Sequence, residues 1–311
     1  PSFGARLTGR VGNWSLGALF ADDRAPGERV ASTDPMSGRS APVGVVRLQR
    51  QWRRRGQVST FGVMATSQDF GSSHNRVFSV DTRLQVLRNW SFTGQASTSD
   101  TRLTDGRKLA GPAFYAAWRH SGRHFVSNTI YSDIGPGFRT QVGYIRRVEV
   151  RQVSHQNGYI WRPARGAVQS FGPTLSGVIN YDRTGRLQDW SVTPEFEVGV
   201  IRGTNLSVER EEAYEYYGGF GFRKHSTKLA AESEWMRWFN VSGSAMFGTG
   251  LNYTPAAGLR PFLGDAKELT AGFSLRLGPR LHLDETYIYS GLWTTGDSRA
   301  GGAGAGAAVF N

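Results

Sequence analysis

Residues Trp190 to Val200 read WSVTPEFEVGV, and their polarity alternates from one residue to the next. The apolar side chains share one parity: Trp190, Val192, Phe196, Val198 and Val200. Glu195 and Glu197 lie on the other parity, so a strand here would carry one apolar face and one charged face. A soluble sandwich would bury the apolar face in a core, whereas a membrane barrel would turn it to lipid and line a lumen with the carboxylates. This stretch alone leaves both open, and chain-wide features must decide.

The composition excludes a helical membrane protein. Mean hydropathy is −0.40, and no apolar run approaches the roughly 18 residues that a membrane helix needs. A barrel is not excluded, because only half of each barrel strand is apolar. Forty glycines, nine Trp, eleven Tyr and eighteen Phe suit an all-β chain with many turns and interfacial aromatic residues. The absence of cysteine excludes disulfides and thiolate metal sites.

The chain is strongly basic, with a net charge of +12 carried by 33 arginines and four lysines. A nucleic-acid or anionic-surface binder is one class with such a balance. The sequence of such a binder would contain a dense run of basic residues, but the densest basic run in this chain is only Arg53 to Arg55. We therefore expect no nucleic-acid partner and interpret the arginines as spread through a lumen and loops. The sequence opens at Pro1 without a signal-peptide pattern.

Alternation bounded by turn residues predicts roughly sixteen strands. Their ranges are 4–11, 14–22, 42–53, 57–69, 76–88, 90–101, 111–121, 124–132, 148–162, 168–182, 187–201, 204–212, 226–238, 240–253, 267–277 and 280–292. Many reach ten or more residues, which fits a tilted membrane strand better than the usual soluble strand of five or six. Arg50 and Glu285 fall on apolar parities, which indicates a bulge, a rim position or a misplaced boundary.

The connections between the predicted strands alternate in length. Short breaks are expected at 12–13, 53–56, 88–89, 121–122, 163–167, 202–203, 239 and 278–279. Longer ones are expected at 23–41, 70–75, 102–110, 133–147, 213–225 and 254–266, and only the 183–186 link is short among them. Short turns at one end and long loops at the other are typical of an outer-membrane barrel. A Greek-key sandwich has no reason to sort its loops by end.

Tryptophan placement gives an independent indication of the same fold. Seven of the nine fall near the short turns: Trp14, Trp52, Trp90, Trp118, Trp161, Trp235 and Trp238. Only Trp190 and Trp293 fall at the long-loop end. A shared level predicts an aromatic girdle at a membrane–water interface. The alternative, a general preference of Trp for strands, would scatter the residues along the strands.

The direction of the strands predicts that the barrel continues beyond this chain. The first strand ends at a short turn, so something upstream must bring the chain to the opposite side. The last strand runs into a Gly/Ala-rich loop, GGAGAGAA, and the sequence stops at Asn311. We therefore expect residues 1–311 to be a single outer-membrane barrel domain truncated at both ends. The intact barrel would hold at least eighteen strands.

Three stretches carry a resemblance to a known family. They are GARLTGRVGNWSLGAL (Gly4–Leu19), DIGPGFRTQVGYIRR (Asp133–Arg147) and YDRTGRLQDWSVTPEF (Tyr181–Phe196). In order and spacing they resemble a family of bacterial outer-membrane proteins of unknown function. In that family a barrel follows an amino-terminal domain similar to family-nine carbohydrate-binding modules. The resemblance spans most of the chain, implies location and architecture only, and supplies no catalytic residue.

Catalytic and metal-binding patterns are weak. The six histidines form no close group with acids at zinc-ligand spacing, and Asp22 with Asp23 lacks the further ligands that calcium needs. Ser154 and His155 are strand neighbours and would point to opposite faces, so a barrel-embedded hydrolase is only an alternative. The glycines of 218–221 lack the strand-to-helix setting of a phosphate loop. We expect no enzyme activity, no cofactor and no metal.

The polar face is the remaining functional candidate. Eight charged residues are expected to line the lumen: Asp81, Arg83, Glu195, Glu197, Lys228, Glu232, Glu234 and Arg276. Burying such charges in lipid costs a few kcal/mol each for Arg or Lys, so a wet lumen is their expected environment. Rows of charge in a lumen can set solute selectivity, and they can equally solvate the wall or hold a plug.

The sequence thus predicts an all-β, large antiparallel up-and-down transmembrane β-barrel of the bacterial outer membrane. It would act as a channel, transporter or surface platform and contact lipid and lipopolysaccharide, with anionic or saccharide-like solutes as candidates. One alternative is an envelope scaffold that binds glycan or protein through its long loops. A barrel-embedded hydrolase that uses His155 and a soluble β-sandwich are the others.

Overall fold

The computed structural model describes residues 2–54, 56–236, 238–256, 258–278, 281–294 and 308–309. The side chain of Trp235 and the segment 295–307, with most of the Gly/Ala-rich loop, lie outside the described residues.

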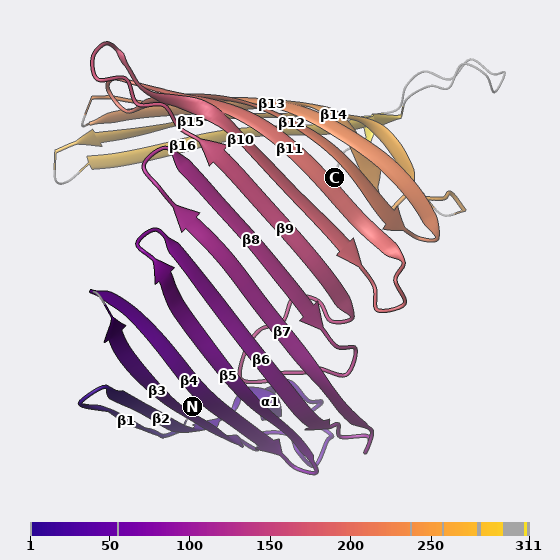
Figure 1. Cartoon of the computed structure of the whole chain (residues 1–311). Coiled ribbons are helices and arrows are strands. Elements are labelled where there is room, and N and C mark those ends of the chain that lie inside the picture. Colours follow the sequence, from indigo (N-terminus) through magenta and orange to yellow (C-terminus); the bar gives the residue numbers. More distant parts are fainter. Residues whose placement is uncertain are drawn as a thin grey trace. The chain divides into compact units, whose positions relative to one another are not determined.

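The described chain is almost entirely β-strand (Figure 1). The elements are β1 (Gly4–Val11), β2 (Trp14–Asp23), α1 (Ala25–Glu28), β3 (Ala41–Arg54), β4 (Gln57–Phe70), β5 (Ser73–Leu87), β6 (Trp90–Arg102), β7 (Lys108–Ser121), β8 (Phe125–Ile134), β9 (Val150–Tyr159), β10 (Val168–Tyr181), β11 (Leu187–Val200), β12 (Thr204–Tyr217), β13 (Phe220–Met236), β14 (Phe239–Asn252), β15 (Phe262–Leu277), β16 (Leu281–Thr294) and β17 (Ala308–Val309). The prediction of an all-β chain of about sixteen up-and-down antiparallel strands is confirmed. The two-residue β17, which pairs with the end of β16, was not predicted.

Two connections that the sequence predicts to be long loops are two-residue turns. β4 and β5 are joined by Gly71 and Ser72, and β12 and β13 by Gly218 and Gly219. Gly71, Gly218 and Gly219 have positive φ angles of 60°, 59° and 89°, which glycine adopts without strain. The error at β12 has a physical reason, because the consecutive Glu211 and Glu212 interrupt the alternation although both belong to the strand.

One predicted short break is instead a longer segment. Residues 160–167 separate β9 from β10, with an isolated bridge between Trp161 and Phe171. The other connections at that end stay short. The loops at 24–40, 135–149 and 253–261 are long, so the difference between the two ends holds for those loops but not for every connection.

The chain divides into two compact units. Unit 1 comprises 1–121, 128–153 and 181–186; unit 2 comprises 122–127, 154–180 and 187–311. Within unit 1, strands β1 to β7 pair with their sequence neighbours in antiparallel register. Within unit 2, β11 to β16 do the same. The prediction of one barrel domain over 1–311 stays a prediction.

Each unit carries an apolar row that crosses its strands at one level. In unit 2 the residues in mutual register are Phe196, Val208, Leu229, Ala245, Leu269 and Tyr289. In unit 1 they are Leu16, Leu48, Val63, Val80, Ala96 and Phe114. Leu229 is 50% exposed and Phe114 is 47% exposed, so neither row is covered by other described residues as the core of a sandwich would be.

Candidate functional site

A group of charged strand residues of unit 2 lies on the face opposite its apolar row. Glu195 lies directly across from Glu209, and Glu209 lies directly across from Lys228. Glu197 lies two residues after Glu195 on β11 and pairs in register with Ser207 of β12. Successive side chains of a strand alternate between its two faces, so these groups share the face that Phe196 and Leu229 do not.

These side chains line a groove of about 360 Å³, which we call the unit-2 groove. It contains four of the eight predicted lumen residues: Glu195, Glu197, Lys228 and Glu232. Hydroxyl groups complete it, from Ser207, Ser242, Ser244 and Thr270, with the amide of Asn205. Three carboxylates against one ammonium group suit a cation or hydroxyl groups better than an anion.

In unit 1, Arg47 on β3 forms an ion pair with Asp81 on β5 across the intervening strand β4. The Arg47 Nη2 to Asp81 Oδ1 distance is 2.7 Å. The residue between them is Gly62, and a Cβ there would lie 2.9 Å from Arg47 Nη2 and 2.9 Å from Asp81 Oδ2. The missing side chain of Gly62 is therefore what lets the pair close. Arg83 lies two residues after Asp81 on β5, on the same face, opposite Thr60 and Thr93.

The last two predicted lumen residues lie apart from the unit-2 groove. The main-chain amide of Glu234 donates a hydrogen bond to the carbonyl of Gly203, next to the β11–β12 turn. The Arg276 Nε lies 3.4 Å from Nε2 of His282, which is paired with Asp284 at 3.1 Å. The structure thus brings half of the predicted residues into one groove and distributes the rest.

The loop between β8 and β9 folds back onto the polar face of unit 1, which the sequence did not predict. The Asn75 side chain binds two of its main-chain groups: Nδ2 donates to the Arg139 carbonyl at 3.0 Å, and Oδ1 accepts from the Gln141 amide at 3.0 Å. Ser99 Oγ accepts from the Arg139 amide at 2.9 Å, and Asn75 Nδ2 also donates to Thr101 Oγ1 at 2.7 Å. Asn75 is 0% exposed, so the loop seals it completely.

Packing fixes the same loop. Phe138 is 3% exposed and lies over Gly111 of β7, where an added Cβ would come 2.7 Å from the Phe138 nitrogen. Gly135 donates its amide hydrogen to the carbonyl of Pro112 at 2.8 Å. We call residues 135–147 the inward loop, because hydrogen bonds and a buried ring hold it on the polar face.

Two of the stretches that carry the family resemblance meet at the base of the inward loop. Asp133 forms ion pairs with Arg151, at 3.2 Å, and with Arg183 in the β10–β11 turn. The Asp133 side chain is only 10% exposed. Asp182 holds that turn closed by accepting hydrogen bonds from Thr184 and Arg186, and its pKa is lowered, chiefly by the Thr184 hydroxyl.

The tryptophans predicted as a girdle share parity with the apolar face where register defines it. Trp14 and Trp52 share parity with Leu16 and Leu48, and Trp118 shares parity with Phe114. Trp90 packs against Trp118, with ring centroids 5.6 Å apart. Trp161 bridges to β10, Trp238 follows β13 in the turn, and Trp235 lies in β13 with its side chain outside the described part. The girdle itself stays a prediction.

Arg50 belongs to the same level and needs no bulge. It pairs in register with Trp14 and Phe61, and its guanidinium lies 5.4 Å from the Trp14 ring centroid. The Arg50 guanidinium over the Trp14 indole, next to the short turns, fits the rim position that was one of the interpretations of the sequence. The long arginine side chain can reach towards water from there. Glu285 pairs in register with Phe273, also without a bulge.

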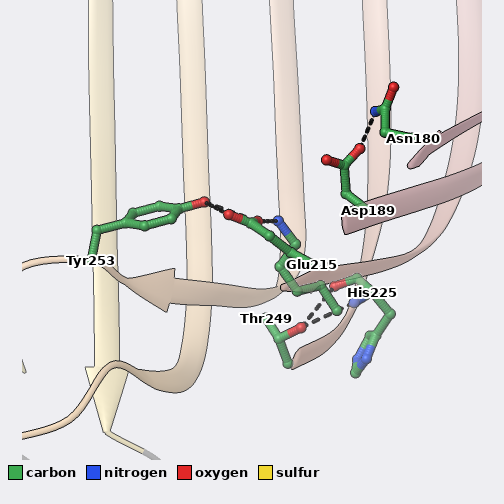
Figure 2. A network of polar contacts seen from close by, with 7 residues as sticks. Asn180, Asp189, Glu215, His225, Thr249 and Tyr253 are labelled. Atoms are coloured by element: carbon green, nitrogen blue, oxygen red, sulfur yellow. Dashed lines mark hydrogen bonds and ion pairs between the residues drawn. The ribbon is translucent and has the colours of Figure 1, made fainter. Parts of the chain in front are cut away.

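A polar network holds the β14–β15 loop of unit 2 (Figure 2). The Tyr253 hydroxyl donates to the Glu215 carboxylate, 2.9 Å from Oε1, and Lys224 forms an ion pair with the same carboxylate. Burial of the phenol, followed by its bond to the Glu215 carboxylate, raises the pKa of Tyr253 to about 12. Asn180 donates to Asp189 at the same end of the strands.

No metal centre emerges from the residues the structure describes. They contain no group of three His, Cys, Asp or Glu side chains placed to hold a metal ion. His155 lies on β9 between Ser154 and Gln156, and His74 pairs with Asp100 at 3.2 Å. In the described ranges, no helix has the length and apolar character needed to cross a bilayer.

Comparison with known proteins gives little beyond a distant likeness in structure. No family model and no curated protein matches the sequence. The crystal structure of Acinetobacter baumannii OccAB3 superposes with a TM-score of 0.44 at 7% identity, covering 88% of this chain and 86% of the other. Acinetobacter baumannii OccAB2 gives 0.46 at 8% identity, covering 91% and 88%. Both scores lie below 0.5, so the functional proposal rests on the strands and side chains described above.

Proposed function

We propose that this chain is a bacterial outer-membrane β-barrel whose polar faces line an aqueous passage for small polar solutes. One observation carries the proposal: the apolar rows of both units are uncovered, while the opposite faces hold charges and hydroxyl groups. Exposed apolar surface of this extent is rare on soluble monomers and marks contact with a membrane or a partner. Outer-membrane lipid and lipopolysaccharide are the partners that such a row would contact.

The strand lengths support a membrane rather than a protein partner. The strands of unit 2 from β10 to β16 have 14 to 17 residues, more than the roughly 9–11 that a tilted strand needs to cross the hydrocarbon layer. Arg50 and the exposed Trp14, Trp52 and Trp118 lie near the short turns, where an interface would place them.

The polar face determines which solutes pass. The carboxylates of the unit-2 groove outnumber its ammonium group, so this wall attracts cations. Within unit 1, the inward loop lies on the polar face of β5 to β7 and occupies part of the space beside that face. The passage is therefore a filter with a charged wall, and the net positive charge of the whole chain does not decide its selectivity.

The test is planar-bilayer conductance of the refolded intact protein. Discrete conductance steps are expected, with a reversal potential that favours cations in a salt gradient. Glu195→Gln combined with Glu197→Gln should reduce cation preference, whereas the control Glu234→Gln, a carboxylate outside the unit-2 groove, should not. Inserted protein that carries no current at any voltage would contradict the proposal.

A further inference from the structure

A second pocket, of about 320 Å³, lies in unit 1 beneath the inward loop. Its wall on one side is the polar face of the sheet, with Ser79, Gln95, Ser97 and Tyr115. The loop supplies the other side, with Phe138, Thr140, Tyr144 and Ile145. The volume falls near the lower end of the range of about 300–1,000 Å³ typical of small-molecule sites.

The pocket is neutral in a highly charged chain. The residues that line it have hydroxyl, amide, aromatic or aliphatic side chains, except for the thioether of Met64 and for Gly143, and none is charged. The whole sequence contains 37 basic and 25 acidic residues, so a pocket lined by neither kind differs clearly from the composition of the chain. A charged ligand would find no counter-charge here and would lose its hydration without compensation.

One polar atom in this wall has no partner. Ser79 is 1% exposed, and its Oγ makes no hydrogen bond to any described residue. A buried hydroxyl without a partner is unfavourable, because its bond to water is lost on folding and not replaced. Ser79 lines the pocket, so a ligand hydroxyl could supply that missing partner.

We propose that this pocket is a binding site for a small neutral polyhydroxylated molecule, with a single sugar ring as its type. The rings of Tyr115 and Phe138 offer apolar faces to the carbon side of such a ring. The side chains of Ser79, Gln95, Ser97 and Thr140 offer donors and acceptors to its hydroxyl groups. The site goes beyond the proposed passage and does not depend on it, because binding needs only unit 1 with the inward loop seated.

The experiment measures equilibrium binding to the full chain in detergent by calorimetry, with glucose, glucosamine and glucuronate as probes. Glucose should bind saturably, and the two charged sugars should bind at least about tenfold more weakly. Glucose without saturable binding, or equal binding of all three sugars, would overturn the proposal. Because no conductance is measured, failure here and failure of the passage are distinguishable.

Two matched variants separate a ligand contact from a structural role. Ser79→Ala should weaken glucose binding about five- to tenfold and leave the thermal unfolding temperature unchanged or higher, because the hydroxyl has no bond to lose in the free protein. Thr66→Val removes another buried hydroxyl without a partner on the neighbouring strand, outside the pocket, and should leave binding unchanged. Equal losses in both variants, or no loss in Ser79→Ala, would overturn the assignment.

Discussion

Asn75→Ala should release the inward loop from the polar face of unit 1. The side chain forms two hydrogen bonds to the loop main chain, each 3.0 Å long, and one to Thr101. A hydrogen bond contributes about 1 kcal/mol net, so the two loop bonds contribute about 2 kcal/mol. That loss raises the population of the unseated loop about 30-fold, since about 1.4 kcal/mol corresponds to a factor of ten. The Ser99 and Gly135 contacts remain, so the loop should open transiently rather than permanently.

Cysteine labelling measures this opening directly, because the chain has no cysteine of its own. A cysteine at Ser97, which lines the pocket under the loop, should react with a maleimide up to about 30-fold faster when Asn75→Ala is added. A cysteine at Ser207 in the unit-2 groove is the control and should react at an unchanged rate. Equal labelling rates at Ser97 with and without Asn75 would refute the reasoning that Asn75 holds the loop.

Three further perturbations probe other parts of the structure. Gly62→Ala should abolish the coupling energy between Arg47 and Asp81, because the new Cβ would occupy the space between the two side chains. In the parent protein, a double-mutant cycle with Arg47→Gln and Asp81→Asn should give a coupling energy of about 0.5–1 kcal/mol. An undiminished coupling energy in the Gly62→Ala background would contradict this. Leu229→Arg should destabilise the protein in lipid vesicles by about 2–4 kcal/mol, whereas Ala230→Arg on the polar face should change its stability little. Equal losses of unfolding free energy in urea titrations of the two variants would contradict the assignment of Leu229 to the lipid-facing side. In ultraviolet titration the Tyr253 phenol should ionise near pH 12, and after Glu215→Gln its pKa should lie nearer the ordinary value of 10. Because folding raises this pKa, the stabilisation from the contact between Tyr253 and Glu215 is complete below pH 10 and is lost as the pH rises through about 12.

The strands could be predicted from the sequence because one face of each is apolar. Leu269 and Leu275 alternate with Glu268 and Arg276, and the structure pairs them in that register. Alternation fails where both faces are polar, as at Glu211 and Glu212, and there the predicted strand stops too early. The period-two pattern therefore locates strands wherever lipid or packing would sort the side chains, and shortens them elsewhere.

The polar face could be predicted only in part. Parity places Glu195, Glu197, Lys228 and Glu232 on one face, but their gathering in one groove depends on the register between strands, which no single strand encodes. The inward loop has no sequence signature of this kind. Among the contacts that hold this loop are the hydrogen bonds of the Asn75 side chain, which binds main-chain groups 64 and 66 residues further along the chain.

The measurement that most directly tests the central claim is the environment of two adjacent residues on β13. Single cysteines at Lys228 and Leu229 would carry an environment-sensitive fluorophore in protein reconstituted into vesicles. The label at 229 should be quenched by a lipid-borne nitroxide and the label at 228 by aqueous iodide. A label at 229 that neither quencher reaches would reveal a dry protein interior and contradict the claim that this face meets lipid.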